Sequence, residues 1–328
     1  MSNKELPAFP ARRIWHKAAH NAFTDLAWFR NAWWCVFREA SNHVSADGKI
    51  RLLRSVDGRR WRTMQVFALQ GDLRDPSLVV TLDEQLTLLA ALKVDRSEHG
   101  YSHQVYAWQA KTGRQWQGPI AVGEKDLWLW RVAFQGNTGL GVAYKVGGNY
   151  HTRLYSTQDG IHYHKVLERF RGEHIRDEYS NESGLCFEQN GTAWCLLRRD
   201  PQHALLGSAA PPYTQWQWRE ANERIGGPVM VCLDDGRLLS VVRLYGYTDG
   251  ELTSARTSFA WVNRTTGELT ECGTLPSAGD TSYAGLIVRD GIAYVSYYSS
   301  HANSPYGQTK PAIYFAAVPL NELKPEQA

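Results

Sequence analysis

Short runs of apolar, β-branched and aromatic residues follow one another along most of the chain, from Phe23 to Ala317. Gly, Asn and Asp residues typical of turns separate these runs, and no segment keeps a helical periodicity over about a dozen residues. Many short strands with regular turns are typical of a β-sandwich, barrel or propeller. The clearest predicted strands are residues 33–39, 49–55, 77–82, 86–92, 103–108, 139–146, 152–157, 193–199, 237–245, 292–299 and 312–318.

A recurring turn decides among these architectures. SVDGRRW, from Ser55 to Trp61, ends a strand with Ser-x-Asp-Gly and an aromatic residue, and STQDGIHY, from Ser156 to Tyr163, repeats this order with one extra residue. Degenerate versions are AKTGRQW, PPYTQWQW and NRTTGELT, so the five starts are at positions 55, 110, 156, 211 and 263. A period near fifty residues is that of a four-stranded propeller blade. The sequence therefore predicts about six blades in one domain over 1–328, with an N-terminal extension at 1–15 and a tail at 321–328.

The turn itself has a structural explanation. Its Asp can accept backbone N–H groups, its Gly supplies a positive φ, and its aromatic residue can pack back onto the blade. Because every blade needs such a hairpin, we do not expect these turns to be catalytic.

Composition limits the partners and the compartment. The formal net charge is only +3 and no block of Lys and Arg occurs, so nucleic acid is not an expected partner. The first twenty residues lack the apolar core of a secretory signal, and no run of about 18 apolar residues is present, so a cytoplasmic chain without membrane contact is expected unless a signal has been trimmed. The five cysteines lie mostly in apolar runs without CxxC pairing, which favours buried thiols over disulfides or a metal site. No cofactor is predicted.

One hairpin, residues 180–200, carries unexpected charge. Apolar runs flank an Asn-Gly turn at Asn190, but Glu182 lies near one end and Arg198 and Arg199 at the other. Charges in a half-buried sheet are costly unless they are paired or used. For Arg199, beside Asp200, a structural ion pair is the favoured interpretation.

The repeated turns resemble the Asp-box, or BNR, repeats of sialidases and related propellers, and this resemblance extends over most of the chain. It implies an all-β, six-bladed β-propeller of four-stranded antiparallel blades, and an exo-acting glycoside hydrolase. In that family a Glu near the start of a strand precedes, by one hairpin, an Arg that ends the returning strand. Glu182 and Arg198 match this layout, which implies that Glu182 is the base for a tyrosine nucleophile and that Arg198 binds the substrate carboxylate.

Two further segments extend the resemblance. Residues 256–288 are similar to the family segment that carries the last clamp arginine and the nucleophile, which implies these roles for Arg256 and Tyr283. RDPSLVV, which begins at Arg74, is similar to the family's Asp-Pro strand start and makes Arg74 and Asp75 candidate pocket residues.

The chain also departs from the family pattern. HNAFTDL places His20 where the first clamp arginine of the family stands, and His43 lies where the general-acid Asp is expected, with Asp25 and Asp47 as alternative acids. Arginines that end apolar strands and can point into the central funnel are candidates to replace the missing one; they are Arg38, Arg131 and Arg243.

The chemistry of these residues is coherent. A phenol titrates near 10, so a tyrosine nucleophile needs a neighbouring base, and Glu182 beside Tyr283 would supply it. Two guanidinium groups suit one planar carboxylate, and a histidine such as His43 can act as an acid near neutrality. With one clamp arginine and the usual acid replaced, another acidic sugar, such as a different 2-keto-3-deoxy acid or a uronic acid, is favoured over ordinary sialic acid.

Three functions remain open at this point. The first is a retaining exo-glycosidase that acts on a terminal acidic sugar through Tyr283, Glu182 and His43 or a nearby Asp. The second is a polysaccharide lyase that uses a His and a Tyr for β-elimination on a uronate. The third is a non-catalytic carbohydrate-binding propeller, which predicts that Glu182, Arg256 and Tyr283 lie far apart.

Overall fold

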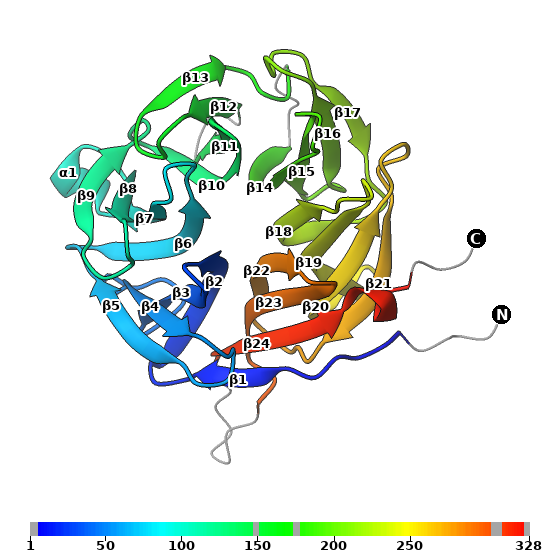
Figure 1. The fold of residues 1–328 in the computed structure, drawn as a ribbon, viewed down its shortest axis with the longest axis horizontal. Helices are drawn as coiled ribbons and strands as arrows, with labels where there is room; N and C mark the ends of the chain where they lie inside the picture. Colours follow the sequence, from blue (N-terminus) through cyan, green and yellow to red (C-terminus); the bar gives the residue numbers. More distant parts are fainter. Residues whose placement is uncertain (1–5, 147–150, 173–177, 303–309, 325–328) are drawn as a thin grey trace.

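The protein is a six-bladed β-propeller, as the sequence predicts (Figure 1). A computed structural model describes residues 6–146, 151–172, 178–302 and 310–324. Within these ranges six four-stranded antiparallel sheets surround a central axis. The innermost strands are β2, β6, β10, β14, β18 and β22, and the strands of each blade are counted from the innermost outward. In the same ranges no helix is long and apolar enough to span a lipid bilayer.

The blades follow one another in chain order. Blade 1 contains β2 (His20–Phe29), β3 (Ala32–Ala40), β4 (Lys49–Ser55) and β5 (Arg62–Phe67); blade 2 contains β6 (Asp72–Val80), β7 (Leu86–Lys93), β8 (His103–Ala110) and β9 (Gln117–Val122); blade 3 contains β10 (Leu127–Gln135), β11 (Thr138–Lys145), β12 (Thr152–Thr157) and β13 (Tyr163–Leu167). Blade 4 contains β14 (Tyr179–Phe187), β15 (Ala193–Asp200), β16 (Leu205–Ala209) and β17 (Gln217–Glu220); blade 5 contains β18 (Ile225–Cys232), β19 (Leu238–Thr248), β20 (Glu251–Val262) and β21 (Leu269–Leu275); blade 6 contains β22 (Thr281–Arg289), β23 (Ile292–Ser299), β24 (Ala312–Pro319) and β1 (Arg12–Trp15). The short helix α1 (Arg96–His99) and the 3-10 turn η1 (Leu320–Glu322) lie between or after strands.

All five repeated turns connect the third and fourth strands of a blade. In the first, Asp57 Oδ1 accepts the backbone N–H of Arg60 at 2.9 Å, and Trp61 Nε1 donates to the carbonyl of Gly58. Asp159 accepts the backbone N–H of His162 in the same way. The fifty-residue period of the sequence is therefore the distance from one blade to the next.

The N-terminal strand closes the ring. Residues 12–15, predicted to precede the domain, form β1, which pairs antiparallel with β24 as the outermost strand of blade 6 (Figure 1). Trp15 Nε1 donates to Glu39 Oε1 at 2.6 Å, which joins β1 to blade 1. Because this strand comes from the other end of the chain, blade 6 needs no connecting turn, and five turns serve six blades.

Apolar side chains fill the space between neighbouring blades. Phe259 and Val241 of blade 5, for example, are buried against Tyr297 and Val295 of blade 6. Leu323, in the predicted tail, is also buried there, and its carbonyl accepts Trp261 Nε1. Sheet-to-sheet packing of this kind fixes the angular position of each blade and therefore of its inner strand.

Every inner strand is interrupted by a bulge at the same depth. In each pair of first and second strands the register shifts so that two residues oppose one. A bulge of this kind bends the strand and redirects its side chains. The six bulged pairs are Phe23 and Thr24, Asp75 and Pro76, Trp130 and Arg131, Asn181 and Glu182, Gly227 and Pro228, and Tyr283 and Ala284.

Candidate active site

Tyr283 and Glu182 form a direct hydrogen bond at the centre of the propeller. The phenol of Tyr283 donates to Glu182 Oε1 at 2.6 Å. Arg198 Nη1 lies 2.8 Å from Glu182 Oε2 and 3.1 Å from the phenol oxygen, so it contacts both groups. The convergence of Glu182, Arg198 and Tyr283 that the sequence predicted is therefore present.

The bulges explain this arrangement. Glu182 and Tyr283 belong to the bulged pairs of blades 4 and 6, and Tyr283 has a φ of 46°. Arg198 is the single residue of β15 opposite the bulge that contains Glu182. Without the extra residues, alternation along the strands would turn these side chains toward other faces of the sheet.

Gly227 completes the cradle around Glu182. Its backbone N–H donates to Glu182 Oε2 at 2.8 Å, and its φ of 54° is one that glycine adopts readily. A Cβ at this position would lie 2.9 Å from Cγ of Tyr283, so only glycine leaves room for the ring. Gly227 was not among the residues predicted from the sequence, although the GGP segment at 226–228 lies outside every repeated turn and signals an unusual backbone.

The surroundings of Tyr283 favour the neutral form of its phenol. Burial raises the pKa of Tyr283, and the charge of Glu182 raises it further, while Arg198 and Arg243 oppose the shift. Glu182 accepts hydrogen bonds from Tyr283, Arg198 and Gly227. Glu182 Oε1 is therefore the acceptor toward which the phenol proton of Tyr283 is directed.

Asp75 supplies a second carboxyl group close to Tyr283. It is a bulge residue of blade 2 with a φ of 46°, and its side chain is only 7% exposed. A small pocket is lined by Asp75, Trp130 and Tyr283 together. Burial raises the pKa of Asp75, against the opposing charge and hydrogen bond of Arg74, whose Nε donates at 3.0 Å.

Arg74 and Arg38 are held by carboxylates of their own. Arg74 contacts both Asp75 and Asp72 and lies over the ring of Phe23. Arg38 is fully buried, and its Nε donates to Asp72 at 2.7 Å. These contacts place Arg74 beside Asp75 and Phe23, and Arg38 behind them on the far side of Asp72.

His20 and His43 meet at Asp280, a residue that the sequence analysis did not select. His43 Nδ1 lies 2.8 Å and His20 Nε2 3.3 Å from Asp280 Oδ2. Burial raises the pKa of Asp280, but hydrogen bonds from both histidines and Tyr298, with the charge of Arg243, lower it more, so the net shift is downward. The side chain is therefore a carboxylate at neutral pH.

Phe23 separates this histidine cluster from the nucleophile candidate. Its ring centroid lies 5.2 Å from that of His43 and 5.3 Å from that of Tyr283, edge-on in both cases. His43 therefore lies on the other side of the Phe23 ring from Tyr283, with its side chain 52% exposed. Asp280 lies 237 positions from His43 and 260 positions from His20, so no local sequence motif predicts this cluster.

Arg243 lies over the ring of Tyr283. Its guanidinium carbon is 4.9 Å from the centroid of the Tyr283 ring. Nη2 reaches the phenol of Tyr298 at 3.1 Å and Asp280 Oδ1 at 3.3 Å. Of the three arginines predicted to replace the missing clamp residue, this one is in contact with Tyr283.

Arg256 does not join this group. Both its Nε and Nη2 donate to the carboxylate of Glu271, at 2.8 and 2.7 Å, and its side chain is 40% exposed. Arg256 and Arg198 therefore do not form the predicted two-arginine clamp, because Arg256 pairs with Glu271 on the neighbouring strand β21. Arg199 pairs with Glu178 and Glu220, in keeping with its predicted structural role.

The two alternative acids have structural partners. Asp47 accepts the backbone N–H of Ser41 at 3.0 Å, and hydrogen bonds from Ser45 and Ser41 lower its pKa, which makes it a poor proton donor at neutral pH. Asp25 accepts the backbone N–H of Leu78 at 2.8 Å and pairs with Arg131. Neither carboxylate has a hydrogen bond to Tyr283 or Glu182 among the described residues.

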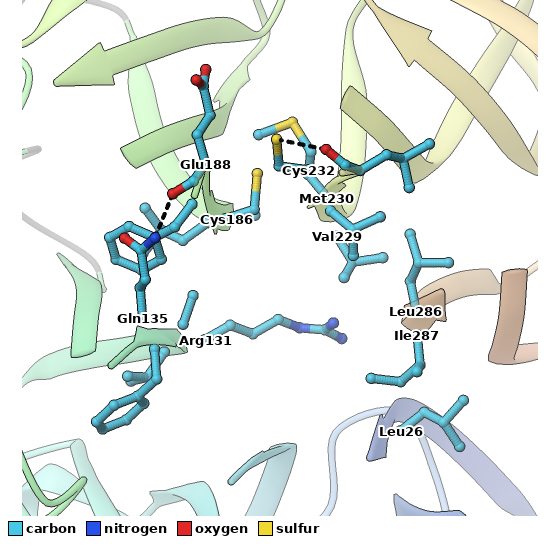
Figure 2. A pocket seen from close by; sticks show the side chains of 18 of the residues that line it. Leu26, Arg131, Gln135, Cys186, Glu188, Val229, Met230, Cys232, Leu286 and Ile287 are labelled. Carbon is cyan, nitrogen blue, oxygen red and sulfur yellow. Dashed lines mark hydrogen bonds between the residues drawn. The ribbon is translucent and has the colours of Figure 1, made fainter. Parts of the chain in front are cut away.

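Asp25 and Arg131 line a separate cavity on the propeller axis, on the side of the inner strands away from Glu182. This cavity has a volume of about 460 Å³ and is formed by the later residues of the inner strands, whereas Glu182, Asp75 and Tyr283 lie in their earlier parts. Arg131 also donates to the carbonyls of Ala284 and Thr24, and Figure 2 shows it reaching toward the middle of the channel, with Leu26 and Ile287 nearby. The Asp25–Arg131 pair therefore ties blades 1, 3 and 6 together below the candidate active site.

Comparison with solved structures confirms the fold. The chain superimposes on a protein of unknown function from Dyadobacter fermentans with a TM-score of 0.71, 16% identity and coverage of 94% of this chain and 98% of the other. An α-L-arabinofuranosidase from Fusarium graminearum, in complex with an iminosugar inhibitor, gives 0.70, 10%, 96% and 99%. A mutant sialidase from Streptococcus pneumoniae gives 0.69, 10%, 96% and 71%. The chain therefore shares the six-bladed propeller fold of these proteins. No protein-family model matches the chain, and no curated protein sequence does.

Proposed function

We propose that this protein is a retaining glycoside hydrolase in which Tyr283 is the nucleophile and Glu182 its base. The observation that carries this proposal is the 2.6 Å hydrogen bond between the phenol of Tyr283 and Glu182, with Arg198 in contact with both oxygens. Sialidases with a tyrosine nucleophile do not follow the rule of two closely spaced carboxylates, so the arrangement is chemically sufficient. The similar folds of an arabinofuranosidase and a sialidase also support hydrolysis of a glycosidic bond.

The first step forms a glycosyl-tyrosine intermediate. The Tyr283 oxygen attacks the anomeric carbon while its proton passes to Glu182, and the bond to the leaving-group oxygen breaks as that oxygen takes a proton from Asp75. Transfer to Glu182 avoids a free phenolate, which the raised pKa of Tyr283 makes costly. Arg198 then stabilises the charge that develops on the phenol oxygen during attack and departure.

The second step restores the enzyme. A water molecule gives a proton to Asp75 and attacks the anomeric carbon, and Tyr283 leaves and recovers its proton from Glu182. Two displacements at one carbon retain the anomeric configuration.

Asp75 is the acid that the geometry favours over His43. Its buried carboxyl lines a small pocket together with Tyr283, and burial raises its pKa against the opposing charge and hydrogen bond of Arg74. His43 is in contact with Asp280 and lies beyond the ring of Phe23. We therefore assign the role of proton donor to Asp75 and treat His43 as the alternative.

An uncharged terminal sugar is the favoured substrate. Arg198 already faces Glu182 and Asp200, Arg243 faces Asp280, and Arg256 faces Glu271. A carboxylate clamp needs guanidinium groups with free donors directed at one point, and the internal carboxylates occupy many of these donors. The acidic sugar that the sequence favours remains the competing substrate class.

The two other functions receive less support. A non-catalytic propeller predicts that Glu182, Arg256 and Tyr283 lie apart. Arg256 does lie apart, paired with Glu271, whereas Glu182 and Tyr283 are hydrogen-bonded to each other. A lyase that uses His43 and Tyr283 as its base and acid would need both side chains close to the same sugar unit. The Phe23 ring lies between them and contacts both, which keeps them apart.

A substrate screen tests the proposal. Wild type and Glu182→Gln are assayed against neutral and acidic aryl-glycosides and oligosaccharides, and the anomer first released is identified by NMR. We expect hydrolysis with retention by wild type, and loss of at least about 10²-fold in Glu182→Gln. Ultraviolet-absorbing unsaturated products would instead establish the lyase, and binding without turnover would establish the non-catalytic propeller.

A further inference from the structure

We propose that His20, His43 and Asp280 form a binding site for a divalent transition-metal ion, with zinc as the best match, beside the Phe23 ring. One ligand atom from each residue, namely His20 Nε2, His43 Nδ1 and Asp280 Oδ2, lies within 4.8 Å of the other two. Two imidazoles and one carboxylate are the donor set of many zinc sites that keep a position open. The site does not depend on the proposed glycosidase activity.

The spacing of the donors is compatible with an ion between them. The two histidine nitrogens lie 3.3 and 2.8 Å from the shared carboxylate oxygen. Ligands about 2 Å from a tetrahedral zinc ion lie about 3.3 Å from one another, so only small movements of the exposed His43 are needed. His20, whose side chain is 9% exposed, is already fixed with Nε2 toward Asp280.

The second oxygen of Asp280 is held from behind. Tyr298 donates its phenol to Asp280 Oδ1 at 2.6 Å, and Arg243 Nη2 lies 3.3 Å from the same oxygen. This division leaves Oδ2 to the histidines and orients it toward them, as supporting residues do for carboxylate ligands of metals. Tyr298 is therefore a positioning residue for the site.

Two features determine how tightly the proposed site should bind zinc and what else the ion could contact. Arg243 is a permanent cation close to the carboxylate, and its charge weakens binding of a divalent ion, so we expect exchangeable rather than permanently held zinc. His43 and Asp280 have side chains that are 52% and 30% exposed, which leaves the remaining coordination positions open to water or to a sugar hydroxyl. Because His20 and His43 belong to blade 1 and Asp280 precedes β22 of blade 6, a bound ion would also link the first and last blades.

Direct binding tests the site. Protein without a histidine tag is treated with chelator, titrated with zinc chloride by calorimetry, and assayed for zinc by mass spectrometry after gel filtration. We expect one equivalent of zinc and a zinc-dependent rise in Tm. Cobalt added in place of zinc should give visible absorption bands with imidazole ligands.

Variants locate the ion. His43 lies in an exposed loop, and His43→Ala should lower zinc affinity at least tenfold. His162→Ala, which removes another exposed histidine that contacts an aspartate, Asp159, should leave the affinity unchanged. Tyr298→Phe should lower the affinity less than His43→Ala while one equivalent still binds at saturation. Absence of zinc binding by wild type would overturn the proposal, as would binding that His43→Ala does not weaken. In that case the three side chains form only a hydrogen-bonded cluster.

Discussion

The phenol of Tyr283 donates a 2.6 Å hydrogen bond to Glu182, although the two residues lie 101 positions apart. Blades 4 and 6 carry them, and blade 5, which lies between, contributes the Gly227 N–H to the same carboxylate. The contact therefore depends on the correct angular placement of three blades. It is also the contact on which the proposed chemistry depends most directly.

Tyr283→Phe should remove glycosidase activity while the protein stays folded. The substitution deletes the nucleophilic oxygen, so we expect kcat to fall by roughly 10³-fold or more, and the lost hydrogen bond to cost only about 1 kcal/mol of stability. Activity and thermal unfolding are measured on the same preparations.

Tyr297→Phe is the matched control for this change. Tyr297 is a buried tyrosine of β23 whose phenol donates to the carbonyl of Pro276. It should lose a similar amount of stability and keep its activity. Equal activity in the two variants would exclude Tyr283 as the nucleophile.

Asp75→Asn should affect substrates according to their leaving groups. A general acid matters most when the departing oxygen is a poor leaving group, so natural glycosides should lose about 10²- to 10⁴-fold and dinitrophenyl glycosides far less. If His43 were the acid, His43→Asn would show this dependence and Asp75→Asn would not.

The pH profile follows from the same carboxyl. Because burial raises the pKa of Asp75 above the ordinary aspartate value of 3.8, its proton is retained at low pH and lost as the pH rises through the folded-state value. Wild-type kcat/KM should therefore decline on the alkaline side of that value, and this decline should be absent from the residual activity of Asp75→Asn. An unchanged alkaline limb in the variant would assign it to another group.

Arg198 and Arg256 should behave differently. Arg198→Lys breaks the dual contact with Glu182 and Tyr283 and should lower kcat/KM by roughly 10²-fold. Arg256→Lys alters only the pair with Glu271 and should leave kcat/KM within about twofold, since Arg256 contacts neither Tyr283 nor Glu182 among the described residues. A comparable loss in both variants would support the two-arginine clamp predicted from the sequence.

Gly227→Ala should displace Tyr283. The new methyl group would lie 2.9 Å from the ring, so we expect at least a tenfold loss of kcat beyond the backbone strain of about 1 kcal/mol. Gly250→Ala is the control, because Gly250 also has a positive φ but no heavy atom within 4 Å of the added carbon. The two variants should share the loss of stability, and only Gly227→Ala should lose activity. Full activity in Gly227→Ala would show that the ring position is not critical.

Removal of β1 should open the propeller. Deletion of residues 1–16 leaves the edge of β24 unpaired and breaks the Trp15–Glu39 hydrogen bond, so we expect a lower Tm and self-association through the exposed edge. Deletion of residues 1–5 alone removes no described residue and is the control. A synthetic peptide of residues 6–19 should partly restore the Tm. A truncated protein as stable as the control would contradict the closure role of β1.

Parts of the site were predictable from local sequence. Glu182 and Arg198 lie on one hairpin, so their separation along the chain already placed them on adjacent strands. Tyr283 followed only from the family resemblance, since its distance from Glu182 is not encoded in any short motif. Arg256 was misplaced because the sequence does not say which face of β20 it occupies or that Glu271 lies across from it.

The sequence by itself determined the architecture, because the repeated turns are local features whose spacing counts the blades. The tertiary structure decided how the site is built. The bulges that redirect Asp75, Glu182 and Tyr283, and the burial that raises the pKa of Asp75, arise only when six inner strands surround one axis. The meeting of His20, His43 and Asp280 likewise needs blade 1 to lie against blade 6, a contact that exists only once the ring has closed.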